Sequence, residues 1–128
     1  MAELQSNYTS IEQSNQLVEL GVPVDSADCY IYTYDEKTIY EMGILNKMNF
    51  TQRKEKQRFP HRMLPCWSAG RLMEILAECY QVDLPFRYFI RGGMMESLVN
   101  TFIDLRDEIN FSVLGQYGVG QCTRENKS

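Results

Sequence analysis

Polar and apolar residues alternate with a helical period near the beginning of the chain, over residues 10–20. Thr9 with Glu12 three residues later fits a capping box at the start of this helix. At its end, Gly21 can adopt the left-handed backbone conformation and Pro23 cannot continue a helix. The pattern predicts a short amphipathic helix that stops sharply.

The same period recurs in two later segments. Ser68 suits the N-cap of a helix over residues 68–80, and Trp67 just before it can pack on Leu72 as a hydrophobic staple. Residues 94–109 carry the longest run of apolar positions at helical spacing. This segment therefore predicts the longest amphipathic helix and a large part of the core.

Aromatic and β-branched residues mark the expected strands. Residues 29–34 are dense in tyrosine and predict a first strand, and residues 38–44 return as the second strand of a hairpin. Alternation of apolar and polar side chains over residues 84–91 predicts a third strand.

Residues 46–65 show no sustained period. The segment is rich in Lys, Arg, Gln and Asn, and contains Pro60 and Pro65. It is predicted to be a long loop. Loops of this length are uncommon inside a compact domain unless they are mobile or functional.

These elements predict an α+β fold in the order α-β-β-α-β-α. We expect a small sheet of two to three strands with about three helices packed mainly on one face. A chain of 128 residues suits a single domain, here expected over residues 1–115, with a flexible tail over residues 116–128. A domain of this size needs neither metal nor disulfides for its stability.

Histidine and cysteine usage favours a protein that is not an enzyme. His61 is the chain's single histidine, and nothing in the sequence places a nucleophile against it. The four cysteines, Cys29, Cys66, Cys79 and Cys122, are far apart rather than in the close pairs typical of zinc sites. We therefore expect reduced thiols, no metal and no cofactor.

The chain begins without a basic segment followed by an apolar run, and it contains no apolar stretch long enough to span a bilayer. The expected location is cytoplasmic, without a membrane partner.

The charges are strongly segregated along the sequence. Residues 47–62 carry a net charge of +5 within a chain whose net charge is -4. Basic side chains contact phosphates and aromatic rings stack on bases, so this segment and the tyrosines of the first strand form a candidate nucleic-acid interface. Its residues are Tyr30, Tyr32, Tyr34, Lys47, Arg53, Lys54, Lys56, Arg58 and Arg62.

A weaker candidate is an anion site at Arg91, Gly92 and Gly93, which immediately precede the last predicted helix. The free N–H groups of a helix N-terminus can hold an anion with help from an arginine. The alternative is a strand-to-helix turn that uses the flexibility of glycine.

Two stretches resemble a family of short proteins encoded by anaerobic gut bacteria and their phages or mobile elements. They are NYTSIEQS at residues 7–14, continuing through LGVPVDSADC at residues 20–29, and LPCWSAGRLMEI at residues 64–75. The resemblance implies origin and a cytoplasmic context, and no activity or site residue.

Two functions of different classes follow as hypotheses. The first is a small non-catalytic protein-interaction module of phage or mobile-element type, which docks a protein partner or a second copy of itself. The alternative is a nucleic-acid-binding protein that uses the basic segment and the neighbouring tyrosines.

Overall fold

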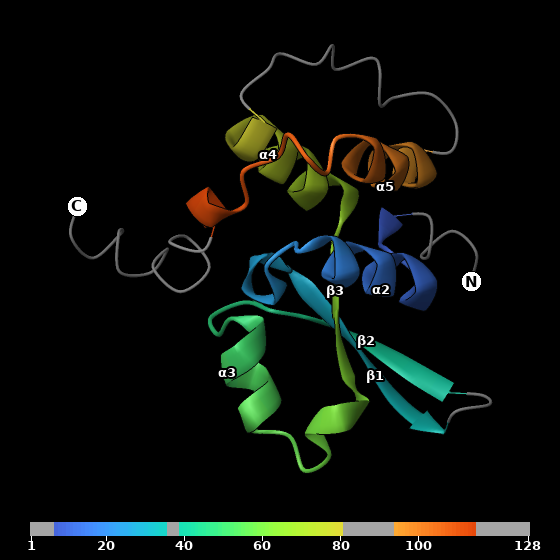
Figure 1. Ribbon diagram of the computed structural model, residues 1–128. Coiled ribbons are helices and arrows are strands. Elements are labelled where there is room, and N and C mark those ends of the chain that lie inside the picture. Colours follow the sequence, from blue (N-terminus) through green and yellow to red (C-terminus); the bar gives the residue numbers. More distant parts are fainter. Residues whose placement is uncertain (1–6, 36–38, 81–93, 115–128) are drawn as a thin grey trace.

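A three-stranded antiparallel sheet forms the middle of the molecule (Figure 1). The structure is a computed structural model that describes residues 7–35, 39–80 and 94–114. Its helices and strands are α2 (Ile11–Leu20), β1 (Cys29–Asp35), β2 (Ile39–Ile44), α3 (Phe50–Glu55), β3 (Met63–Cys66), α4 (Ala69–Tyr80) and α5 (Met94–Asp104), with 3₁₀ turns η1 (Val24–Ser26) and η2 (Pro60–Arg62). The predicted α+β class is confirmed.

Strand β1 is central, in the order β2-β1-β3. Cys29 pairs with Ile44 on one side and with Cys66 on the other. The tyrosine-rich run and its hairpin with β2 are as predicted. Because side chains alternate along a strand, Ile31 faces the helices and Tyr32 faces the opposite way.

The prediction of a long loop over residues 46–65 is wrong. This segment forms α3, η2 and the third strand, β3. Asn49 and Gln52 form a capping box that starts α3. With only six residues, this helix is too short to show a sustained hydrophobic period in the sequence. Pro65 pairs with Tyr30 within β3, which tolerates proline because it is an edge strand.

The last predicted helix is shorter than expected. Helix α5 ends at Asp104 rather than at residue 109. The N–H of Asn110 donates to the carbonyl of Cys79 at 3.2 Å, so the chain has by then turned back to the end of α4. The predicted strand over residues 84–91 and tail over residues 116–128 lie outside the described residues.

Helix α2 ends as predicted and starts one residue later. Ser10, rather than Thr9, is the N-cap and forms a capping box with Gln13. Thr9 is buried and its hydroxyl oxygen accepts from the backbone N–H of Trp67 at 3.0 Å. Gly21 has φ 103°, the left-handed conformation that was predicted.

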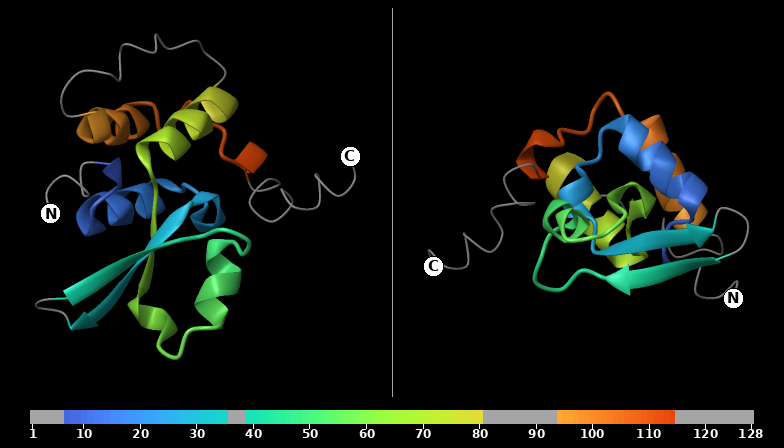
Figure 2. Two further views of the ribbon diagram at one scale, coloured as in Figure 1. Left: turned by 180° about the vertical axis from the view of Figure 1, so that it is seen from behind. Right: turned by 90° about the horizontal axis from the view of Figure 1, so that it is seen from below.

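The main core lies among the helices α2, α4 and α5. Its largest fully buried side chains include Trp67 and Phe102. Helix α2 contacts both β3 and α5, and α4 packs on α5. Helix α3 lies on the other side of the sheet from α4 and α5 (Figures 1 and 2). Helix α2 thus covers one face of the sheet, with α5 and α4 packed beyond it, and α3 lies on the other face.

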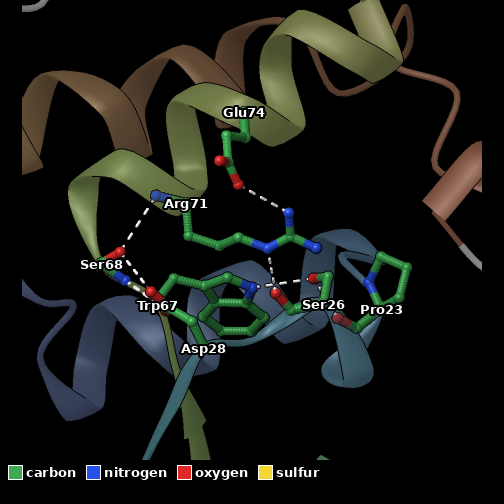
Figure 3. Close-up of polar contacts among 7 residues, drawn as sticks. All are labelled: Pro23, Ser26, Asp28, Trp67, Ser68, Arg71 and Glu74. Atoms are coloured by element: carbon green, nitrogen blue, oxygen red, sulfur yellow. Dashed lines mark hydrogen bonds and ion pairs between the residues drawn. The ribbon is translucent and has the colours of Figure 1, made fainter. Parts of the chain in front are cut away.

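Asp28 joins the start of β1 to the start of α4 (Figure 3). Its carboxylate accepts from the backbone N–H of Ser68 at 2.9 Å and from the Ser68 hydroxyl at 2.5 Å. The Ser68 hydroxyl oxygen in turn caps α4 by accepting from the N–H of Arg71 at 3.1 Å, which confirms the predicted N-cap. Leu45, just after β2, donates its N–H to the Asp28 carbonyl at 3.0 Å.

Ser26 completes this junction on the η1 side (Figure 3). Its hydroxyl accepts from the indole N–H of the wholly buried Trp67 at 3.0 Å. Its carbonyl accepts from Nε of Arg71 at 2.7 Å. Arg71 also pairs with the exposed carboxylate of Glu74 at 3.0 Å. Buried polar groups with satisfied partners fix one packing arrangement, so this junction sets the angle between sheet and helices.

Replacing Asp28 by Ala is predicted to destabilise the protein by about 2–3 kcal/mol, because Ser68 loses both hydrogen bonds to a charged acceptor. Urea unfolding followed by fluorescence of Trp67, the chain's one tryptophan, measures this change. Glu74→Gln is the matched control: it removes a carboxylate of the same network at an exposed ion pair, and is predicted to cost less than about 1 kcal/mol. Equal losses in the two variants would contradict the role given to Asp28.

Candidate nucleic-acid interface

The basic segment is an ordered part of the fold. Phe50 of α3 is buried with Tyr32 and Met63, which ties the helix to the tyrosine face of the sheet. The N–H of Thr51 donates to the Asp25 carboxylate at 2.8 Å and holds α3 against η1. The structure thus gathers the basic residues from Arg53 to Arg62 on the α3 side of the sheet, whereas Lys47, before α3, lines a hollow together with Arg71 and Glu74 of α4. We call all six predicted cations together the basic surface: Lys47, Arg53, Lys54, Lys56, Arg58 and Arg62.

No cation of the basic surface pairs with a carboxylate of the described residues. Within that part of the chain, Arg71–Glu74 is the one salt bridge. Four of the cations instead lie over aromatic rings, at distances to the ring centroid of 4.5–5.7 Å: Arg53 over Tyr30, Lys54 over Phe50, and Arg58 and Arg62 over Phe59. Such contacts orient a cation without neutralising it, so the positive charge remains available to an anion.

The three predicted tyrosines differ in their surroundings. Tyr32 is buried under α3. Tyr30 is half-buried: the Arg53 guanidinium lies over its ring and donates to its hydroxyl at 3.4 Å. The Tyr30 ring also lies against the backbone of Gly43, its pairing partner on β2, where a Cβ atom would collide with the ring.

Tyr34 is the one tyrosine of the three that is exposed, at 49%. Its hydroxyl donates to the Glu41 carboxylate at 2.6 Å, which raises the pKa of Tyr34 above its ordinary value. Its ring stands edge-on to Tyr32, with centroids 5.2 Å apart. The tyrosines therefore mainly anchor α3 and the hairpin.

Phe59 is the aromatic residue of this surface that sequence reasoning missed. It is 40% exposed and occupies the N-cap position of η2, without a side-chain hydrogen bond to that turn. The Arg62 and Arg58 guanidiniums lie 4.5 and 5.7 Å from its ring centroid, and the His61 ring meets it edge-on at 6.2 Å. The available signal was an aromatic residue between two arginines, directly before Pro60.

Two hollows of about 430 Å³ each flank these elements. The first lies at the junction and is lined by its polar residues, among them Asp28, Ser68 and Arg71, whose side chains already bond one another or Ser26. The second is lined by Val24, Phe50, Thr51, Lys54, Glu55 and Pro60. The first hollow thus holds structural contacts beside Lys47, and the second adjoins the basic surface at Lys54.

The other candidate sites receive no support from the described residues. Within this part of the chain, no three His, Cys, Asp or Glu side chains are placed to hold a metal ion. Arg91, Gly92 and Gly93, the predicted anion site, lie outside the described residues. None of the described helices is long and apolar enough to cross a membrane.

Three described cysteines, Cys29, Cys66 and Cys79, are free and buried. The Cys29 thiol donates to the Cys66 carbonyl at 3.2 Å, and the Cys66 thiol donates to the Thr9 carbonyl at 3.4 Å. The hydrogen bond with the Cys66 thiol, together with burial, raises the pKa of the Cys29 thiol. Burial raises the pKa of Cys79 to about 11. The protonated thiols of Cys29 and Cys79 are therefore poor nucleophiles. The hydrogen bond with Cys29 lowers the pKa of the Cys66 thiol, but Cys66 is wholly buried and out of reach of a reagent. We assign all three cysteines to packing.

Alkylation tests this assignment of the thiols. At pH 8 the native protein is predicted to react slowly with iodoacetamide at Cys29, Cys66 and Cys79, and rapidly once it is unfolded in guanidinium, where a thiol has its ordinary pKa near 8.5. Peptide mass mapping resolves each position. Because the folded pKa values of Cys29 and Cys79 are raised, the contribution of these two thiols to stability is fully present below about pH 8 and falls as the pH rises toward 11. Rapid native alkylation of Cys79 would contradict the assignment.

Comparison of the chain with family models, with curated proteins and with solved structures gave no match.

Proposed function

We propose that the protein is a non-catalytic nucleic-acid-binding module whose contact region is the basic surface. The observation that carries this proposal is the gathering of five cations, from Arg53 to Arg62, on the α3 side of the sheet, without a carboxylate partner among the described residues. The closely spaced phosphates of a nucleic-acid backbone are the anions that a surface with several cations binds through many contacts at once.

The distribution of charge orients the ligand. Outside residues 47–62 the chain has a net charge of -9, so phosphates are repelled elsewhere and held at the basic surface. Lys47, Lys56 and Arg58 are exposed and can reach phosphates directly. Contacts of this kind are independent of base sequence, with dissociation constants of about 10⁻⁴–10⁻⁶ M at physiological salt.

Fluorescence anisotropy of labelled oligonucleotides tests the proposal. Binding is predicted to be saturable, and to weaken about 10³-fold between 50 and 200 mM salt if all six cations contact phosphates. Lys56→Glu is predicted to weaken binding about tenfold and to reduce the slope of log affinity against log salt by about one.

Arg106→Glu is the matched control for that variant. It makes the same change in net charge at an exposed residue two positions after the end of α5, the helix that packs on α2 and α4. The affinity of this variant for the oligonucleotide is predicted to change less than about twofold, because the altered charge is distant and screened by salt. Equal losses for both variants, or no binding at 50 mM salt, would overturn the proposal.

A protein-interaction module is the second candidate, and the edge strand β2 favours it. Among the described strands β2 pairs only with β1, and its Ile39 and Ile44 are 56% and 60% exposed. An edge strand with exposed apolar side chains can accept a strand from another polypeptide.

Ile44→Lys tests this second candidate, because a charged residue on an edge strand opposes strand addition. The variant is predicted to lose partners that the wild-type protein retains in affinity capture from native lysate. Lys56→Glu should retain the same partners. A set of partners that is unchanged by Ile44→Lys would exclude docking at β2.

A further inference from the structure

Phe59 occupies an unusual position for a large apolar side chain, because it is exposed within the most basic segment of the chain, residues 47–62. It is 40% exposed and lies between α3 and β3 on the chain. The buried aromatic residues of the same side, Tyr32 and Phe50, pack on the sheet. Phe59 is not among the residues of that cluster, so the packing of the sheet does not explain it.

The local backbone holds Phe59 in place. Pro60 is the first residue of η2, where its restricted φ suits the start of a helical turn. The N–H of Arg62 donates to the Phe59 carbonyl at 3.0 Å and closes that turn. The ring is therefore presented by a closed turn, which lowers the entropy lost when a ligand orders it.

The cations around the ring define the chemistry of its ligand. The Arg62 guanidinium lies close to the ring centroid, at 4.5 Å, and the Arg58 guanidinium is more distant, at 5.7 Å. Nucleobases stack on both aromatic rings and guanidinium planes, and the adjoining phosphates pair with the arginine charge. An acidic peptide would satisfy the cations but would leave the ring without a stacking partner.

We propose that Phe59 is a base-stacking platform and that the basic surface consequently prefers single-stranded nucleic acid to duplex. This inference rests on the proposed function and adds the class of ligand. In a duplex the bases are stacked on one another, so a ring at a protruding turn reaches only the backbone. In a single strand an unstacked base lies against Phe59 while Arg58 and Arg62 contact its flanking phosphates.

The test compares a labelled oligothymidine with a duplex of equal length at 50 mM salt. Phe59→Ala is expected to weaken single-strand binding roughly five- to hundredfold, the effect of removing one stacked base, and to change duplex binding less than about twofold. Phe59→Trp should retain the single-strand affinity, and the fluorescence of the new indole should be quenched on binding. Phe59→Leu should behave like Ala, because leucine is apolar but offers no ring.

Val18→Ala is the matched control, since it removes an apolar side chain of similar exposure, 38%, from α2. Urea midpoints within error of wild type confirm that each variant is folded, as expected for changes at exposed side chains. If Phe59→Leu binds single strands as well as the wild type does, stacking is overturned although nucleic-acid binding stands. If the wild-type protein binds neither strand form, the proposed function fails as well.

Discussion

The hydrogen bonds of Asp28 hold together the start of β1, the end of β2 and the start of α4. Its carboxylate fixes Ser68 at the start of α4, and its carbonyl accepts the N–H of Leu45 at the end of β2. Trp67, packed beside them, is bonded through its indole to Ser26. One end of the sheet is therefore locked to the helical layer, and the remaining architecture follows from this constraint.

The path of the basic segment is a direct consequence. The chain leaves the locked end of the sheet after Leu45 and must re-enter at the far end, because β3 begins opposite Tyr32 and runs back to Cys66 opposite Cys29. Helices already cover one face, so the connection crosses the other, where Phe50 buries itself against Tyr32. The cations from Arg53 to Arg62 thus lie on the face of the sheet that α2, α4 and α5 leave open, which is the arrangement an anion-binding surface requires.

Sequence reasoning succeeded where a local rule was strong. The αL glycine at Gly21, the N-cap at Ser68 and the tyrosine-rich β1 each depend on one or two neighbouring residues. It failed for residues 46–65, where Pro65 and a high charge resemble a loop. A four-residue edge strand and a six-residue helix are stabilised by tertiary contacts, which no periodicity of their own reveals.

The candidate site shows the same division. Clustering of the cations was predictable, since they are adjacent in sequence and α3 with η2 keeps them together. Which aromatic residue is exposed beside the cations was not predictable, because exposure is decided by packing: α3 covers Tyr32, whereas the turn at Pro60 leaves Phe59 exposed. Alternation on a strand specifies which face a tyrosine occupies, but not which element later covers that face.

The most direct test of the central claim is a ¹H–¹⁵N NMR titration of the labelled protein with an unlabelled single-stranded oligonucleotide. We predict that the shifted amides concentrate in residues 47–62, while those of α2, α4 and α5 keep their positions. Shifts confined to β2 or to the helical layer, or a spectrum that the oligonucleotide leaves unchanged, would contradict the account.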